Sequence, residues 1–261
     1  MALVDEFDGL LIDLDGVVWI GREPVPGAAE ALAALIGDGK PIVFVTNNPG
    51  RPASTYAERL RAAGVPAEEG QIVTAGMVTA SLAAERAGEG ARSFVIGAPA
   101  FKDTAAAAGL ELLDGEAARD ARAVLVSGHR DFDYEELLTA TLALQRGAML
   151  FATSRDPTLP MPGGAWPGTG AVLAAVETAS GAVAEIGGKP ERHLFELARE
   201  RLATDGRVAM VGDRIASDIE GGRRAGLATV LVLSGASTRA EAGAADPPPD
   251  HVADDLAALL R

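Results

Sequence analysis

The feature of this sequence that most restricts its fold is the alternation of short apolar runs with helical segments. The runs at 9–13 (GLLID), 41–48 (PIVFVTNN) and 208–213 (VAMVGD) have the length and continuous apolar character of buried parallel strands. Helices are expected around them at 26–36, 52–63, 191–202, 217–226 and 252–260, and a further strand at 228–235. Strands and helices that alternate in this way form βαβ units. The sequence therefore predicts an α/β fold, with a Rossmann-like parallel sheet and helices on both faces.

The middle of the chain repeats this alternation with elements of its own. Strands are expected at 93–98, 123–128 and 149–154, and helices near 99–108, 134–145 and 170–180. We interpret this part as a second α/β unit inserted into the first, with crossings near 74–79 and 181–188. The expected organisation is a discontinuous catalytic core, residues 1–78 and 186–261, and a large inserted α/β cap domain, residues 79–185.

The charge of the chain narrows the class of partner. Its 37 acidic and 23 basic residues give a formal net charge of −14. Such a surface repels nucleic acid and anionic lipid, so we expect neither as a partner. An anionic substrate would have to be attracted by a local cation, such as a bound metal ion or a buried lysine. The lysines of the chain are Lys40, Lys102 and Lys189.

Two further features bear on redox chemistry and location. The chain has no cysteine, which excludes disulfides, cysteine-ligated metal sites and thiol nucleophiles. It begins with an acidic stretch, MALVDEFDG, unlike an export signal, and has no apolar run of the roughly 18 residues that a membrane span needs. We therefore expect a cytoplasmic protein that does not enter the membrane.

Polar side chains gather at the predicted carboxyl ends of the core strands. They are Asp13 and Asp15 after the first strand, Thr46 and Asn47 at the end of the second, Lys189 before the helix at 191–202, and Asp213 and Asp218 after the strand at 208–213. Ligands of open α/β sheets bind at the carboxyl ends of the strands. We therefore expect these residues to meet in one site.

Each of these residues, taken alone, also has a purely structural explanation. An Asp-x-Asp-Gly stretch often forms a turn, Thr46 could cap the following segment, and Asp213 and Asp218 could be acids favoured by a helix N-terminus. Lys189 could be a solvated surface residue. A calcium-binding EF-hand loop is excluded, because its twelfth residue, counted from Asp13, would be Pro24 instead of glutamate. The combination of residues, in this order, favours a functional site.

The combination suits phosphoryl transfer. Two neighbouring carboxylates, Asp13 and Asp15, can divide the roles of nucleophile and of proton donor and acceptor. Asp213 supplies an oxygen ligand beside Asp13, and a site with oxygen ligands and no cysteine suits Mg²⁺. The remaining phosphoryl oxygens would be held by Thr46, the backbone amide of Asn47, and Lys189.

These stretches resemble the four ordered motifs of the haloacid dehalogenase (HAD) superfamily: 13–19 (DLDGVVW), 45–48 (VTNN), 188–190 (GKP) and 212–219 (GDRIASDI). The GVVW and TNN forms and the position of the insert resemble its subfamily IIA, the NagD-like, p-nitrophenyl phosphatase-like branch. The resemblance extends over the whole chain. It implies a HAD-type phosphatase (a phosphoric monoester hydrolase).

The resemblance also implies a role for each site residue. Asp13 would be the nucleophile that forms an aspartyl-phosphate, and Asp15 the general acid and base. Thr46 and Lys189 would bind the phosphate. The Mg²⁺ ligands would be Asp13, the backbone carbonyl of Asp15, and Asp213, with Asp218 supporting them.

A segment of the predicted cap resembles the substrate-facing loop of the same branch. It comprises 152–156 (ATSRD) and 167–170 (PGTG), with Ser154 where the branch usually has asparagine. On this resemblance Arg155 and Asp156 are candidates for substrate specificity, and a salt-bridged turn is the alternative. Members of the branch often dimerise through the cap, so the resemblance adds a homodimer to the alternatives for the oligomeric state.

The leading hypothesis is a Mg²⁺-dependent phosphomonoester hydrolase that acts on a small phosphorylated metabolite under a mobile cap. A phosphotransferase or phosphomutase would use the same aspartyl-phosphate on Asp13. A non-catalytic protein that binds a phosphorylated metabolite is a third reading, and the presence of Asp13, Asp15, Lys189 and Asp213 argues against it. A structure with Asp13 and Asp213 far apart would contradict the leading hypothesis.

Overall fold

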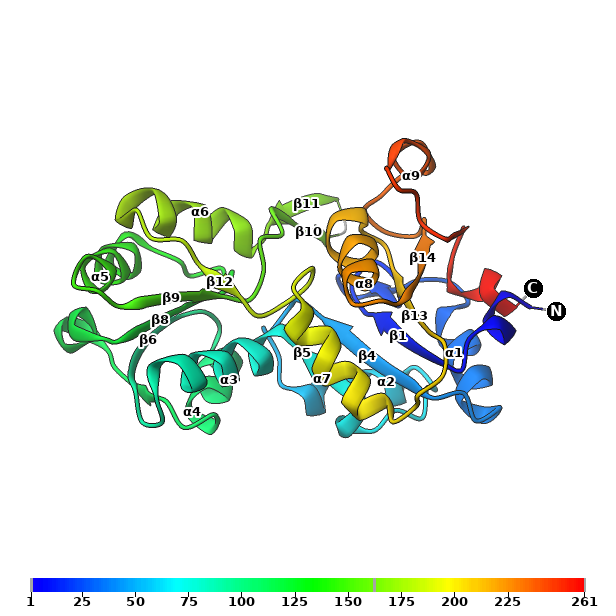
Figure 1. The fold of residues 1–261 in the computed structure, drawn as a ribbon, viewed down its shortest axis with the longest axis horizontal. Helices are drawn as coiled ribbons and strands as arrows, with labels where there is room; N and C mark the ends of the chain where they lie inside the picture. Colours follow the sequence, from blue (N-terminus) through cyan, green and yellow to red (C-terminus); the bar gives the residue numbers. More distant parts are fainter. Residues whose placement is uncertain (1, 162, 261) are drawn as a thin grey trace.

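The structure, a computed structural model, describes residues 2–161 and 163–260 and contains two α/β units, each built on a parallel sheet (Figure 1). The larger sheet has six strands. In spatial order they are β15 (His251–Ala253), β14 (Ala228–Val232), β13 (Val208–Gly212), β1 (Gly9–Asp13), β4 (Ile42–Thr46) and β5 (Ile72–Thr74). All neighbours in it are parallel. The predicted Rossmann-like α/β fold is confirmed.

Alternate residues of β1 pack on opposite faces of this sheet. Leu10 and Ile12 lie in the core formed with α1 (Ala28–Gly37) and α2 (Ala53–Ala62). Leu11 lies in the core formed with α7 (Arg192–Leu202). A strand covered on both faces needs apolar residues at every position, which explains the continuous apolar run. Two short helices, α8 (Glu220–Arg224) and α9 (Arg239–Ala244), follow β13 and β14 in the chain.

The smaller sheet has five parallel strands. In spatial order they are β12 (Glu185–Ile186), β9 (Met149–Ala152), β8 (Ala123–Val126), β6 (Arg92–Ile96) and β7 (Glu111–Leu112). Val124 and Val126 pack with α5 (Tyr134–Gln145) and α6 (Thr169–Ser180). Leu125, on the other face, packs with α3 (Ala75–Ala87) and α4 (Pro99–Ala107). This unit therefore has its own apolar core on each side of its sheet.

The chain enters the smaller unit through α3, a helix that the sequence interpretation treated as a crossing. α3 contacts β5 and α7 of the larger unit as well as β8 and β9 of the smaller one. The chain returns after β12, which pairs with β9. Residue 78, the expected last residue of the first core segment, lies inside α3. The domain limits at 78/79 and 185/186 stay a prediction.

Two short antiparallel hairpins were not expected from the sequence, because strands of two to four residues leave little periodicity to detect. One is β2 (Trp19–Ile20) with β3 (Glu23–Pro24), and the other is β10 (Thr158–Met161) with β11 (Gly164–Pro167). The first follows the carboxyl end of β1, and the second follows that of β9. Figure 1 shows β10 and β11 between the two units.

The predicted closing helix at 252–260 is wrong. Residues 251–253 form β15, which pairs in parallel with β14, and Leu256–Leu260 form a 3₁₀ helix. Pairing completes the edge of the sheet, and the buried residues Leu256 and Leu259 have the three-residue spacing that a 3₁₀ helix also places on one side. The predicted helix at 217–226 is present, but it begins with a π-helical turn over Ile215–Ile219. No helix in the described part of the chain is long and apolar enough to cross a bilayer.

Candidate active site

The carboxyl ends of β1 and β4 open into a cavity of about 500 Å³ that residues of both units line. The lining residues from the larger unit include Asp13, Asp15, Thr46, Asn47 and Lys189, and those from the smaller unit include His129, Arg130, Asp156 and Trp166. Small-molecule sites commonly have volumes of roughly 300–1,000 Å³. The site residues predicted from separate strands therefore meet at a cavity of suitable size.

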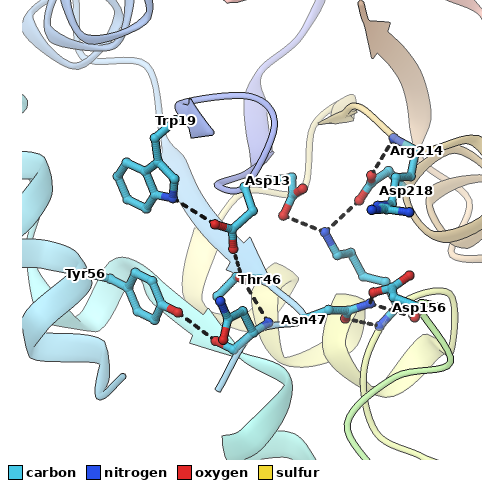
Figure 2. A network of polar contacts seen from close by, with 11 residues as sticks. Asp13, Trp19, Thr46, Asn47, Tyr56, Asp156, Arg214 and Asp218 are labelled. Carbon is cyan, nitrogen blue, oxygen red and sulfur yellow. Dashed lines mark hydrogen bonds and ion pairs between the residues drawn. The ribbon is translucent and has the colours of Figure 1, made fainter. Parts of the chain in front are cut away.

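Lys189 forms two ion pairs at this cavity (Figure 2). Its Nζ lies 2.7 Å from Asp13 Oδ1 and 2.6 Å from Asp218 Oδ1. All three side chains are buried, with Lys189 only 2% exposed. A buried ammonium group is stable only with partners of this kind, so the solvated-surface reading of Lys189 is wrong. The lysine holds Asp13 in a defined position.

Asp213 lies beside these ion pairs and has one oxygen without a partner. Its Oδ2 accepts a 2.7 Å hydrogen bond from the backbone N–H of Ala236. Its buried Oδ1 has no hydrogen-bond partner among the described residues. Gly16 allows this arrangement, because its φ is +93° and a Cβ at this position would collide with Asp213 Oδ2.

One oxygen of each of Asp13, Asp213 and Asp218 lies within 4.8 Å of the others. Asp13 and Asp213 are therefore close together, as the leading hypothesis requires.

Asp15 has a different set of partners. Its Oδ1 accepts a 3.0 Å hydrogen bond from Trp19 Nε1, and its Oδ2 accepts a 3.3 Å bond from Thr46 Oγ1. Trp19 is buried and stacks on Tyr56, with ring centroids 6.3 Å apart, and the Arg59 guanidinium lies 3.8 Å from the centre of the indole. The two neighbouring carboxylates thus occupy two environments, one ion-paired and one hydrogen-bonded.

Asn47 uses its whole side-chain amide in contacts with distant segments. Nδ2 donates to Asp156 Oδ2 at 2.8 Å and to the Lys189 carbonyl at 3.0 Å, while Oδ1 accepts from the Lys189 N–H at 2.8 Å. The sequence interpretation considered only the backbone amide of Asn47. It missed the side chain because these partners lie 109 and 142 residues along the chain, beyond any periodic pattern.

Burial and mutual repulsion change the acidities of the site. Burial raises the pKa of Asp13 well above its usual value, the charge of Lys189 opposes this, and the charges of Asp218 and Asp213 add to it. Burial, followed by the charge of Asp218, raises the pKa of Asp213 to about 7. Burial raises the pKa of Asp15 as well, against the hydrogen bond from Trp19.

The pKa of Lys189 responds in the opposite sense. Burial alone would lower it, but the charges of Asp13 and Asp218 outweigh that effect and raise the pKa. Lys189 is therefore a permanent cation of the site.

Comparisons with known proteins identify the family. A model described as haloacid dehalogenase-like hydrolase matches residues 10–111, and a HAD-hydrolase-like model matches residues 186–259. A glycerol-3-phosphate phosphatase of Gallus gallus is 37% identical, over 99% of this chain and 93% of that protein. The chain belongs to the haloacid dehalogenase-like hydrolase family.

Solved structures agree with this assignment. A glycerol phosphate phosphatase from Mycobacterium tuberculosis, crystallised with magnesium, superimposes on this haloacid dehalogenase-like hydrolase with a TM-score of 0.91. It is 35% identical, and the match covers 100% of this chain and 78% of that one. A p-nitrophenyl phosphatase from Archaeoglobus fulgidus is 32% identical, with a TM-score of 0.87 and 98% of each chain covered. The resemblance to the NagD-like, p-nitrophenyl phosphatase-like branch is confirmed.

This haloacid dehalogenase-like hydrolase is therefore a phosphatase of small phosphorylated metabolites, and magnesium is its cofactor. The buried charges of the site fit a divalent cation. Three carboxylates and one ammonium group carry −3 + 1 = −2 when all are ionised. The unpartnered Asp213 Oδ1 is an anionic oxygen that such an ion would satisfy, and oxygen-only ligands suit Mg²⁺.

The two specificity candidates have different partners. Arg155 forms a two-pronged ion pair with Glu177, with both N–O distances 2.8 Å, and is not among the residues that line the cavity. Asp156 lines the cavity and binds Asn47. The two residues therefore do not form a salt-bridged turn with each other, because Arg155 pairs with Glu177 in α6 and Asp156 with Asn47.

The structure adds two residues that the sequence interpretation passed over. Arg214 lines the cavity, and its Nη2 donates to the Thr158 carbonyl at 2.9 Å. His129 also lines the cavity, while its Nε2 lies 2.7 Å from Glu136. A single arginine after Asp213 and an isolated histidine give no local signal that they line the cavity.

Proposed function

We propose that this haloacid dehalogenase-like hydrolase removes the phosphate group of glycerol phosphate, with Asp13 as its nucleophile. The observation that carries the proposal is the double ion pair of Lys189, which fixes Asp13 at the cavity beside the unpartnered oxygen of Asp213. Glycerol phosphate is chosen because the relatives with that activity match nearly the whole chain.

In the first half-reaction, a carboxylate oxygen of Asp13 attacks the phosphorus atom and the bond from phosphorus to the ester oxygen breaks. Asp15 gives its proton to the departing glycerol oxygen. The raised pKa of Asp15 favours its protonated form at this stage. The product is glycerol, with the phosphoryl group carried on Asp13.

In the second half-reaction, the ionised Asp15 takes a proton from a water molecule, whose oxygen attacks the phosphorus atom. The bond from Asp13 to phosphorus breaks, inorganic phosphate forms, and the carboxylate of Asp13 is regenerated. Thr46, the backbone N–H of Asn47 and Lys189 bind the phosphoryl oxygens in both steps, where negative charge must be stabilised.

Asp13, the backbone carbonyl of Asp15, and Asp213 would hold Mg²⁺. Asp218 supports this set through Lys189, and its Oδ2 accepts a 3.0 Å hydrogen bond from the Arg214 N–H. A bound Mg²⁺ would supply positive charge to the phosphoryl oxygens. It would also explain how a chain with a net charge of −14 attracts an anionic substrate.

The test is a phosphate-release assay with glycerol phosphate and p-nitrophenyl phosphate as substrates. We expect turnover of both with Mg²⁺, loss of turnover after chelation, and recovery when Mg²⁺ is added back. Asp13→Asn should lower kcat by at least about a thousand-fold, because an amide is no nucleophile for phosphorus. Asp131→Asn, at an exposed position, is the control and should leave kcat unchanged. Activity that survives chelation or Asp13→Asn would contradict the mechanism.

Product stoichiometry separates hydrolysis from transfer. Hydrolysis releases one phosphate for each nitrophenolate, with or without an added alcohol acceptor. A transferase would release nitrophenolate in excess over phosphate when the acceptor is present.

We also propose a cytoplasmic location, from the sequence alone, and a homodimer formed through the cap, from the family resemblance. Cell fractionation and sedimentation velocity are the respective tests. A monomer at micromolar concentration would contradict the dimer.

A further inference from the structure

The loop between β9 and β10, residues 153–157, connects the smaller unit to the active site of the larger one. Asp156 in this loop accepts a hydrogen bond from Asn47, and the carbonyl of Thr158, the first residue of β10, accepts one from Arg214. Figure 2 shows Asp156 beside Asn47, and Arg214 beside Asp218. The cap loop is therefore attached to the core at two points.

The two core residues at these points, Asn47 and Arg214, are hydrogen-bonded to the ion pair of Lys189 and Asp218 that holds the nucleophile Asp13. Asn47, besides its bond to Asp156, holds the N–H and the carbonyl of Lys189 with its amide. The N–H of Arg214 donates to Asp218, whose other oxygen pairs with Lys189. A movement of the cap loop would thus reach Lys189 through Asn47 on one path, and through Arg214 and Asp218 on the other.

Backbone contacts hold the loop against the start of α6. The Asp156 carbonyl accepts a 2.8 Å hydrogen bond from the Gly170 N–H. A Cβ at Gly168 or Gly170 would collide with backbone atoms of the loop, so the two segments are packed backbone against backbone. Within the loop, the Asp156 N–H donates to Ser154 Oγ at 3.3 Å.

We infer that Asp156 is a positioning residue, which acts through Asn47 to hold the backbone of Lys189 when the cap lies against the core. The inference rests on the proposed function, in which Lys189 binds the phosphoryl group. In this role Asp156 does not need to contact the leaving group of the substrate, because its Oδ2 already accepts a hydrogen bond from Asn47. Without Asp156, one N–H of the Asn47 amide loses its partner, and only the two bonds to the Lys189 backbone still hold the amide in place.

The kinetic test compares three variants in this loop, each checked for an unchanged melting temperature. Asp156→Ala should lower kcat about ten-fold, the value of one hydrogen bond to a charged group. The factor should be the same for glycerol phosphate and p-nitrophenyl phosphate, because Lys189 serves the phosphoryl group that both share. Asp156→Asn should keep at least half of the activity, since its amide oxygen still accepts from Asn47. Arg155→Ala is the matched control, because that side chain pairs with Glu177 within the cap, and it should not change kcat.

A second measurement does not depend on turnover. The Lys189 N–H is bonded to Asn47, so hydrogen exchange of the peptide 186–192 should become faster in Asp156→Ala and stay unchanged in Arg155→Ala. Arg214→Ala removes the other attachment point and should also accelerate this exchange. In the Asn47→Ala background, Asp156→Ala should have no further effect on exchange, because the connecting side chain is already absent.

Two results would overturn the inference. One is exchange of 186–192 that is the same in Asp156→Ala and in the wild type. The other is a loss of kcat in Asp156→Ala that differs several-fold between the two substrates and that is equally large in Asp156→Asn. That result would mean that Asp156 contacts the leaving group of the substrate. A wild-type protein without phosphatase activity would instead refute the proposed function, while the exchange experiment would still decide the role of Asp156.

Discussion

Asp213→Asn should stabilise the metal-free protein, although it should destroy the metal site. Asp213 is completely buried, and in the folded state its pKa is raised from the usual 3.8 to about 7. A folded-state pKa above the unfolded value means that the folded state binds the proton more tightly. The stability gained from this proton is complete below pH 4, is lost as the pH rises towards 7, and is absent above that.

The size of the effect follows from the same pKa values. One pH unit corresponds to about 1.4 kcal/mol, so the interval from 3.8 to about 7 gives an upper limit of about 4 kcal/mol at pH 8. Asparagine never ionises, and its oxygen can still accept the hydrogen bond from Ala236. Even half of the upper limit would raise Tm by about 4 °C in a chain of this length.

The assay is thermal denaturation in chelator at pH 4 and pH 8. We expect Asp213→Asn to melt above the wild type at pH 8 and close to it at pH 4, whereas Asp131→Asn, at the surface, should follow the wild type at both. Added Mg²⁺ should stabilise the wild type and leave the variant unchanged. A metal-free variant that melts below the wild type at pH 8 would contradict a raised pKa of Asp213.

Three other predictions concern neighbouring residues. Lys189→Met leaves buried carboxylates unpaired, so the free energy of unfolding at pH 8 should fall by about 3–5 kcal/mol in chelator, and an unchanged denaturation midpoint would contradict the ion-pair account. Trp19→Phe removes a hydrogen bond that lowers the pKa of Asp15. In a plot of kcat against pH, the change that reports the ionisation of Asp15 should therefore move to higher pH. No movement would exclude Asp15 as the source of that change. Gly16→Ala should weaken Mg²⁺ binding, measured by calorimetry, at least ten-fold, because its Cβ would displace the carboxylate of Asp213. Gly39→Ala is the control, because Gly39 also has a positive φ, +79°, but has open space around it. That variant should bind Mg²⁺ normally and lose about 1 kcal/mol of stability.

The strands of four or five residues in the two parallel sheets could be predicted, because burial on both faces leaves a local record in the sequence. The run GLLID at 9–13 coincides with β1, and each of its residues is buried. Short elements left no such record. The hairpin β10–β11 has four residues in each strand and needs both partners to form, and β15 is a strand only because the edge of β14 is free to pair with it.

The candidate site divides in the same way. The positions of Asp13, Thr46 and Asp213 at strand ends were predictable, since parallel strands bring their carboxyl ends to one edge of a sheet. The Trp19–Asp15 hydrogen bond was not, because it depends on a hairpin that folds the indole back over the loop. Arg155 and Asp156 are adjacent in sequence, yet only the fold shows that Arg155 pairs with Glu177 inside the smaller unit and that Asp156 contacts Asn47 of the larger one.

The sequence alone shows which carboxylates, hydroxyl and lysine of this protein stand at strand and helix ends, and in what order. These are local properties, because strand periodicity and end residues are set within a few positions of the chain. Which of these groups form hydrogen bonds and ion pairs with one another is known only from the folded chain. Those energies depend on distances of a few ångströms between segments that lie from about thirty to more than a hundred residues apart, and on the burial that makes an unpaired charge costly.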